Sequence, residues 1–404
     1  MCYNLVTMIA LKIKEILESP ENGVIRKMFE EGILLKKKYG EKNVFDFSLG
    51  NPDLDPPLEV EEAIKKIAEE KTHGCHGYMS NSGYSRVCDA MAEKTSLEQG
   101  IKISGENIVM EVGAAGAMNV FFKAILNQDD EVVVPAPFFA EYGHYVKNHG
   151  GILKPVSTKS DFSLDINAIK SVLCEKTAAI IINSPNNPTG RIYTAEEIKE
   201  LTELLLEHGK NTGRMPYIVC DEPYRAIVYG DKKVASVFPL YKNSVVVTSF
   251  AKNLSIPGER IGYIAINPNC EDSKSLKAAC VLATRILGFV NAPAFFQKVV
   301  ALSWNAPVDY SLYEKRCKEI SSIMDYAGLK YAKPEGAFYL FVKVPEGWNN
   351  DDMKFCEHLK SFNILCAPGS GFGAKGWFRI AYCVSEETIL NSKEAFYKAT
   401  HTKP

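Results

Sequence analysis

The sequence has little net charge and no long block of like charge. Its 404 residues include 47 Lys and Arg and 49 Asp and Glu, which gives a formal net charge of -2 at pH 7. Nucleic acids and anionic membranes attract strongly basic surfaces. We therefore expect neither a nucleic acid nor a membrane as the main partner.

Long hydrophobic runs and closely paired cysteines are also missing. The apolar N-terminus, Met1–Leu11, has no basic start and is followed by Lys12 and Lys14, so it is too short and too interrupted for a signal peptide or a membrane span. No two of the 11 cysteines form a Cys-x-x-Cys pair, which disfavours a disulfide framework. The sequence therefore predicts a cytoplasmic protein in a reducing compartment.

The composition is that of a large globular protein, with 46% apolar and 24% charged residues. Its length predicts two structural units, one large and one small. Between residues 108 and 266, nearly continuous apolar strands alternate with helical runs such as 194–208, which favours a mostly parallel sheet covered on both faces. After residue 300 a helical run, 310–327, precedes strand-like segments, which indicates a smaller α+β unit. The expected strands are 108–112, 131–134, 178–182, 217–220, 244–248, 261–266, 337–342 and 377–382.

Lys252 follows one of these expected strands. A lysine at the mouth of a sheet is poorly hydrated, so its ammonium loses a proton more easily than a surface lysine does. Ser249 and Arg260 flank it with a hydroxyl and a guanidinium, which together suit a phosphate dianion. This combination favours a lysine that holds pyridoxal phosphate as a Schiff base. The alternative is a lysine that extends into solvent beside a surface loop.

Asp221 ends another expected strand, and Tyr224 follows it by three residues. A carboxylate at this place can keep a pyridine nitrogen protonated, and the phenol can donate to a ring oxygen. The alternative is an acidic residue in a turn that Pro223 enforces.

Two turns carry weaker signals. Asn187 lies in the turn Asn187-Pro188-Thr189-Gly190, where its amide could bind the same ring oxygen, although these residues are also ordinary turn formers. The small residues 113–116 join a strand to a helix, so their backbone N–H groups can approach an anion at the helix N-terminus.

Arg379 lies in an otherwise apolar strand, where a lone charge is costly and needs a partner. A bidentate substrate carboxylate fits this need, and an internal Asp or Glu fits it equally. The segment His73-Gly74-Cys75-His76 offers metal-ligand types, but no second cluster accompanies it, so we expect a loop and no metal.

Taken together and in this order, these residues resemble the fold-type I, class I and II pyridoxal-phosphate aminotransferases, the aspartate aminotransferase-like group. The resemblance extends from Phe47–Pro52 to Arg379. It implies a mixed, mostly parallel seven-stranded sheet in a large domain, 58–299. It also implies a small α+β domain, 300–404, which the N-terminal segment 1–57 joins.

The resemblance also implies a role for each motif. Lys252 forms the Schiff base and moves the α-proton, while Asp221 binds the pyridinium nitrogen. Phe139 stacks on the cofactor, and Tyr78 reaches the phosphate in the neighbouring subunit, which implies a homodimer. The residues implied at the cofactor's ring oxygen are Asn187 and Tyr224; at its phosphate, Gly113, Ala114, Ala115, Ser249 and Arg260; and at the substrate, Gly50, Asn187 and Arg379.

The resemblance is incomplete in two places. Ala251 stands where many relatives have a hydroxyl residue, so the phosphate site loses a donor. Arg285 lies near the position of an arginine that binds a second carboxylate, but it is also compatible with a solvated helix face. The expected reaction is ping-pong transamination between an L-amino acid, aspartate by default, and a 2-oxo acid. The alternatives are a β-lyase, a racemase or a decarboxylase on the same fold, and, more distantly, a non-catalytic regulatory protein.

Overall fold

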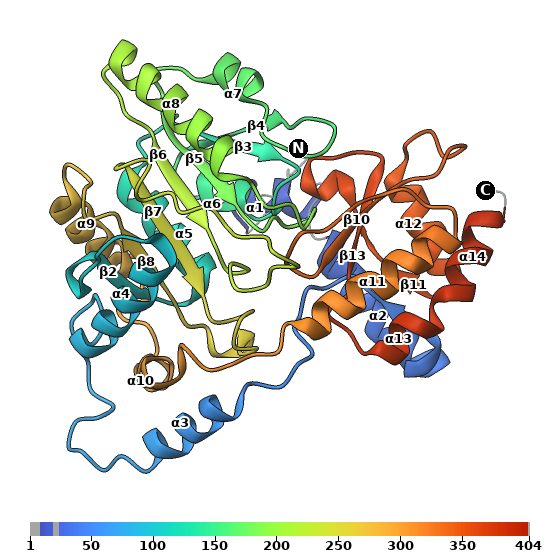
Figure 1. The fold of residues 1–404 in the computed structure, drawn as a ribbon, viewed down its shortest axis with the longest axis horizontal. Helices are drawn as coiled ribbons and strands as arrows, with labels where there is room; N and C mark the ends of the chain where they lie inside the picture. Colours follow the sequence, from blue (N-terminus) through green and yellow to red (C-terminus); the bar gives the residue numbers. More distant parts are fainter. Residues whose placement is uncertain (1–8, 19–23, 403–404) are drawn as a thin grey trace, which may run out of the picture.

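The computed structural model describes residues 9–18 and 24–402. Most of the apolar N-terminal stretch therefore lies outside the described residues. Figure 1 shows two lobes: one holds the large sheet, and the other holds the C-terminal elements together with α2 near the N-terminus. In the described part of the chain, no helix is both long and apolar enough to cross a bilayer. The cysteines of that part are all free thiols.

A seven-stranded sheet organises the larger lobe, in the order β2-β8-β7-β6-β5-β3-β4. All pairs are parallel except those of β8, which runs antiparallel to both neighbours. The predicted mixed, mostly parallel sheet is therefore confirmed. The strands are β2 (Ile108–Glu111), β3 (Glu131–Ala136), β4 (Ile152–Ser157), β5 (Thr177–Asn183), β6 (Tyr217–Asp221), β7 (Ser244–Ser249) and β8 (Gly262–Ile266).

The strand β4 was not predicted, and its position in the sheet explains why. It lies at the edge, and its sequence, Ile-Leu-Lys-Pro-Val-Ser, is largely exposed or half-buried. Proline cannot donate to a sheet, and an edge strand needs no continuous apolar run. The hydrophobic pattern that revealed the central strands is therefore absent from β4.

Helices cover both faces of this sheet (Figure 1). Alternate side chains of β5 show the arrangement, because Ile180 and Ile182 belong to the core on one face and Ile181 to the core on the other. The helix α8 starts at a capping box made by Thr194 and Glu197. The helices of this lobe are α3 (Leu58–Ala68), α4 (Ser85–Gln99), α5 (Gly113–Ile125), α6 (Tyr142–Lys147), α7 (Ile166–Val172), α8 (Ala195–Thr212), α9 (Ser273–Ile286) and α10 (Ala294–Ser303), with the 3-10 helices η2 (Gly105–Asn107) and η3 (Pro257–Glu259).

The smaller lobe has its own core around a four-stranded antiparallel sheet in the order β12-β13-β10-β9. The chain segment before the large sheet joins this lobe, since β1 (Phe45–Asp46) pairs with β11 (Ile364–Leu365). This pairing brings residues 48–50 to the boundary between the lobes. The other elements are α1 (Leu11–Glu18), α2 (Val24–Tyr39), η1 (Glu41–Asn43), α11 (Ser311–Tyr326), β9 (Tyr331–Ala332), β10 (Tyr339–Lys343), α12 (Asp352–Ser361), β12 (Ala367–Pro368), η4 (Gly369–Phe372), β13 (Trp377–Ala381), α13 (Glu386–Asn391) and α14 (Lys393–His401).

Candidate active site

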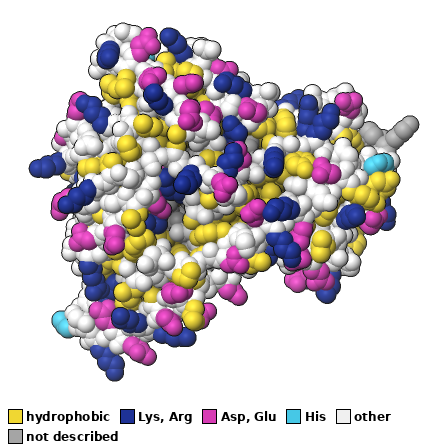
Figure 2. Space-filling model, in the orientation of Figure 1, with side chains coloured by type: hydrophobic (Ala, Val, Ile, Leu, Met, Phe, Trp, Pro, Cys, Tyr) yellow, Lys and Arg dark blue, Asp and Glu magenta, His cyan; other side chains and the backbone are white. Residues whose placement is uncertain are grey.

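A cavity of about 1280 Å³ lies at the carboxyl ends of β5, β6 and β7 and extends to the smaller lobe. In Figure 2, apolar side chains follow the boundary between the two lobes on the visible face. Most of the predicted site residues line this one cavity although they come from distant parts of the chain. Those that line it are Gly50, Ala114, Ala115, Phe139, Asn187, Asp221, Tyr224, Ser249, Lys252, Arg260 and Arg379.

Lys252 lies just beyond β7, and its Nζ donates a hydrogen bond to the carbonyl oxygen of Gly50. The nitrogen also lies 5.6 Å from the centre of the Phe338 ring. Burial, with smaller contributions from the nearby cations Arg379 and Arg260, lowers the pKa of Lys252 to about 8. About one tenth of this amine is therefore neutral, and nucleophilic, at pH 7, far more than for an ordinary lysine with a pKa near 10.5.

Asp221 is the last residue of β6 and is buried. The hydroxyl of Tyr142 donates to its Oδ2, and Asn183 donates to its backbone oxygen at 2.9 Å. Its Oδ1 is buried and has no hydrogen-bond partner among the described residues. Burial raises the pKa of Asp221 to about 7, while the Tyr142 hydrogen bond opposes this rise. One carboxylate oxygen is therefore held in place and the other is left for a ligand.

An anion site is built where α5 begins. Gly113 has a φ of 80°, and a Cβ atom added there would lie 2.9 Å from Nη2 of Arg260. Glycine therefore lets the guanidinium approach the first turn of α5, where Ala114 and Ala115 line the cavity. Ser249, the last residue of β7, adds a hydroxyl to the cavity wall. A helix N-terminus, a guanidinium and a hydroxyl together suit a phosphate group.

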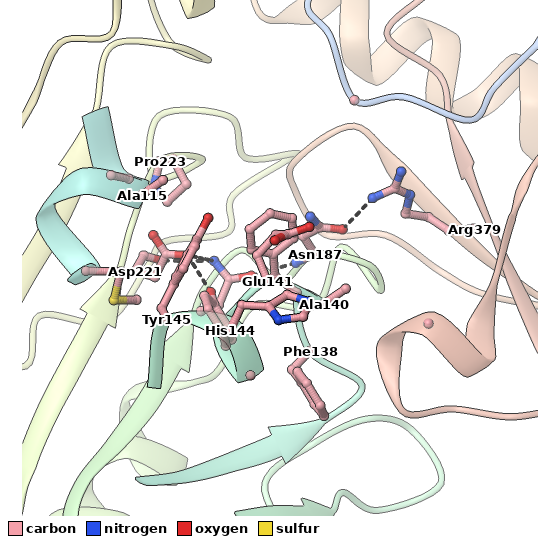
Figure 3. Close-up of a pocket in the computed structure, with 18 of the residues that line it drawn as sticks. Ala115, Phe138, Ala140, Glu141, His144, Tyr145, Asn187, Asp221, Pro223 and Arg379 are labelled. Atoms are coloured by element: carbon pink, nitrogen blue, oxygen red, sulfur yellow. Dashed lines mark hydrogen bonds between the residues drawn. The ribbon is translucent and has the colours of Figure 1, made fainter. Parts of the chain in front are cut away.

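Arg379 approaches from β13 in the smaller lobe, and its side chain is buried. Its Nη1 donates to Oδ1 of Asn187 at 3.0 Å, the dashed contact in Figure 3, and its Nη2 donates to the backbone oxygen of Ser48 at 2.6 Å. Among the described residues, its hydrogen-bond partners include no Asp or Glu, and its Nε has no partner. A buried guanidinium whose partners are all neutral is suited to an anionic ligand.

Three contacting residues were missed from the sequence. Tyr142, the first residue of α6, lies three residues after Phe139, and their rings meet edge-to-face with centroids 5.6 Å apart. Asn183 ends β5 and also accepts the backbone N–H of Asn187 at 2.7 Å. Tyr339, in β10, places its hydroxyl 2.8 Å from that of Tyr224. Only Asn183 carried a usable signal, as a polar residue at the end of an apolar strand, because the two tyrosines are typical of core aromatics.

Other predicted residues lie outside the cavity. Tyr78 is 92% exposed, and Arg285 is exposed in the last turn of α9. Gly113 borders the anion site without lining the cavity itself. The segment His73–His76 lies in a turn region, and among the described residues no group of three or more His, Cys, Asp or Glu could hold a metal ion.

The chain is similar to known proteins over almost its whole length. The model of a family described as "Aminotransferase class I and II" matches residues 42–396. A probable aspartate/prephenate aminotransferase from Aquifex aeolicus is 32% identical over 373 residues, which is 88% of this chain and 91% of that protein. The aspartate aminotransferase of Bacillus subtilis is 32% identical over 371 residues, which is 87% of this chain and 90% of that protein.

Solved structures give the same result. A crystal structure of an aminotransferase from Eubacterium rectale matches with a TM-score of 0.92 and 36% identity, covering 98% of both chains. The aspartate aminotransferase of Thermus thermophilus with maleate matches with a TM-score of 0.85 and 25% identity, covering 98% of this chain and 100% of that chain.

Proposed function

The chain belongs to the class I and II aminotransferases, as its motifs and fold type predicted, and from this premise we propose how its residues carry out transamination. Membership implies pyridoxal 5'-phosphate as cofactor and an amino acid and a 2-oxo acid as substrates. The observation that carries the proposal is Lys252, a half-buried amine of lowered pKa. It lines the same cavity as Asp221, whose carboxylate has one free oxygen, and Arg379, whose hydrogen-bond partners are neutral.

The residues of the cavity fit this cofactor. The free Oδ1 of Asp221 suits a protonated ring nitrogen, because a buried carboxylate oxygen needs a donor. The anion site at the start of α5, with Ser249 and Arg260, suits the phosphate. Phe139 offers a ring face, and Asn187 and Tyr224 offer polar groups for the ring oxygen. When bound, the cofactor supplies an electron sink for the charge that develops at the substrate α-carbon.

Lys252 has two roles in this proposal. It would bond covalently to the cofactor in the resting enzyme, and its pKa of about 8 leaves more of the amine neutral near pH 7 than in an ordinary lysine. As a free amine, Nζ would take the α-proton of the substrate as general base. Because Nζ donates to the carbonyl oxygen of Gly50 in this structure, that contact defines a resting position for the amine.

Asp221 orients the cofactor, and Arg379 orients the substrate. Asp221 keeps the proton on the ring nitrogen, since Tyr142 fixes the carboxylate through its other oxygen. Arg379 binds the α-carboxylate of the substrate, with Asn187 and the backbone near Gly50 beside it. Substrate binding therefore replaces neutral partners of Arg379 with a charged one.

For the substrates we propose aspartate as the first amino donor to test, since the curated relatives include proteins named aspartate aminotransferase. Arg285 does not line the cavity in this chain, so we assign no residue to a second substrate carboxylate. We further propose a cytoplasmic homodimer in which the exposed Tyr78 reaches the phosphate site of the neighbouring subunit.

The test is a spectral titration of the purified yellow protein with each common amino acid. Transamination predicts conversion to the pyridoxamine form and its reversal by a 2-oxo acid. In Arg379→Leu, the amino acid concentration needed should rise by about 100-fold, because an ion pair in a desolvated site is lost. Release of pyruvate and ammonia without an oxo acid, or no conversion with any amino acid, would contradict the proposal.

A further inference from the structure

Tyr339 occupies the point where three parts of the site meet. It lies in β10 and is 2% exposed. Its hydroxyl is 2.8 Å from the hydroxyl of Tyr224, and its ring centre is 4.6 Å from the guanidinium carbon of Arg379. A Cβ atom added to Gly50 would lie 2.0 Å from the Tyr339 hydroxyl. The glycine at position 50 therefore leaves the space that this hydroxyl occupies.

The strand register explains the contact with Arg379. In the antiparallel pair β10·β13, Tyr339 lies opposite Ala381, and Phe341 lies opposite Arg379. Tyr339 and Arg379 are thus diagonal neighbours on one face of the small sheet, within reach of long side chains. The guanidinium carbon also lies 4.8 Å from the centre of the Phe372 ring. Two aromatic rings therefore restrict the orientation of Arg379.

We propose that Tyr339 is a positioning residue that couples the cofactor end of the site to the substrate end. Its hydroxyl fixes the phenol of Tyr224, and its ring fixes the guanidinium of Arg379. The inference rests on the proposed function, because it takes Tyr224 to face the cofactor and Arg379 to face the substrate carboxylate.

The two hydroxyl groups determine which tyrosine donates to the other. Each phenol has one proton, so when Tyr224 donates to a ring oxygen, Tyr339 donates to Tyr224. A phenol that accepts a hydrogen bond becomes a stronger donor, since hydrogen bonds in a chain polarise one another. Removing the Tyr339 hydroxyl should therefore weaken the bond that Tyr224 makes to the cofactor, without removing any direct contact with the cofactor.

A purely structural role makes a different prediction. The neighbouring residues Phe338, Leu340 and Phe341 are fully buried, so Tyr339 could act only as one more core side chain. Phenylalanine would then replace it without functional effect, because it preserves the ring and its packing. Tyr339→Phe consequently separates the two readings, while Tyr339→Leu also removes the ring from Arg379.

The experiment compares six holoenzymes: wild type, Tyr339→Phe, Tyr339→Leu, Phe372→Leu, Tyr224→Phe and the double variant of Tyr224→Phe with Tyr339→Phe. The first readout is the pH titration of the bound cofactor's absorbance without substrate, and the others are KM for the amino donor, kcat and Tm. We call the midpoint of this absorbance titration the spectral pKa. In Tyr339→Phe we expect the spectral pKa to rise by about 0.5 unit or more. The KM of this variant should change less than about 3-fold, and its Tm should stay nearly the same. The ring of Phe372 lies near the guanidinium of Arg379, and no contact with Tyr224 is seen among the described residues. In Phe372→Leu, the KM for the amino donor should therefore rise, while the spectral pKa should equal that of the wild type.

Tyr339→Leu should combine both effects. In Tyr224→Phe, adding Tyr339→Phe should shift the spectral pKa no further, because the shared bond is already lost. An unchanged spectral pKa in Tyr339→Phe would overturn the inference. A double variant whose spectral pKa shift equals the sum of the two single shifts would also overturn it. If the wild type binds the cofactor but transaminates no amino acid, the proposed function fails, while the absorbance titration still decides the role of Tyr339.

Discussion

Three ionisable side chains of the cavity lack a partner of opposite charge within the described chain: Asp221 and Arg379 are buried, and Lys252 is half-buried. Lys252 contacts a carbonyl oxygen, Asp221 accepts from a phenol and keeps one oxygen free, and Arg379 contacts an amide and a carbonyl. Burying such groups is costly, and a protein retains them where a ligand supplies the opposite charge. In the proposed function, a protonated ring nitrogen supplies the opposite charge for Asp221, and a substrate carboxylate supplies it for Arg379.

The lowered pKa of Lys252 predicts how the apoenzyme captures its cofactor. Only the neutral amine attacks the cofactor aldehyde, so the capture rate should rise with pH and level off above about 8. Stopped-flow absorbance of apoenzyme mixed with pyridoxal phosphate measures this rate, with a lysine peptide as the control that levels off near pH 10. A rate that still rises steeply between pH 9 and 10 would contradict a desolvated Lys252.

At the residue scale, the sequence predicted the residues that stand in recognisable motifs at strand ends, such as Asp221 and Lys252. It did not predict Tyr142 or Tyr339. A buried tyrosine that serves a site has the same local pattern as one that fills a core. Their importance arises from contacts across 79 and 115 residues of sequence, to Asp221 and Tyr224 respectively.

At the scale of elements, β2 and α9 meet at a buried acid. Glu111 ends β2 and is fully buried, with the hydroxyl of Thr284 donating to its Oε1 at 2.6 Å. Its Oε2 has no partner among the described residues. Burial raises the pKa of Glu111 to about 8, so the folded protein keeps this carboxyl protonated near neutral pH.

Glu111→Gln should therefore stabilise the protein more at high pH than at low pH. Between the unfolded pKa, near 4.5, and the folded value of about 8, folding takes up a proton, so stability falls as pH rises through this window. We expect the Tm of Glu111→Gln, relative to wild type, to increase by several degrees from pH 5.5 to pH 8.5. Thermal unfolding at both pH values measures it.

The matched control is Glu106→Gln in η2, because the side chain of Glu106 is 93% exposed. Its Tm difference from wild type should be nearly the same at both pH values. Equal pH dependence of the two variants would show that Glu111 ionises normally in the folded state.

The connection between the lobes is also an element-scale feature. The backbone oxygen of Gly190 accepts from the N–H groups of Glu335 and Gly336 at 2.9 and 3.0 Å, and Lys232 pairs with the Glu335 carboxylate at 2.6 Å. These bonds hold the turn that carries Asn187 against the lobe that carries Arg379. The apolar periodicity predicted the elements on either side, but it contains no information on how two lobes dock.

At the scale of the whole molecule, the site exists only because three chain regions converge. The bond from Lys252 to Gly50 spans 202 residues, and that from Arg379 to Asn187 spans 192. The sequence motifs identified each region separately. Only the family resemblance predicted that the three regions come together in one site. The division into segments 1–57, 58–299 and 300–404 remains a prediction.

A homodimer with shared sites can be tested by complementation. In the proposed dimer, Tyr78 serves the neighbouring site, so mixing Lys252→Ala with Tyr78→Ala chains creates hybrids with one intact site. After random re-association, about one quarter of all sites should be intact, and activity at limiting cofactor should exceed that of either variant alone. Activity equal to the mean of the separate variants would contradict sharing.

The central claim is that Lys252 is the residue that bonds to the cofactor. The direct measurement is borohydride reduction of the holoenzyme followed by peptide mass mapping, with Lys252→Ala treated in parallel. The account predicts one reduced cofactor group, on the peptide that contains Lys252, and none in the variant. A cofactor group on another lysine, or undiminished labelling of Lys252→Ala, would contradict it.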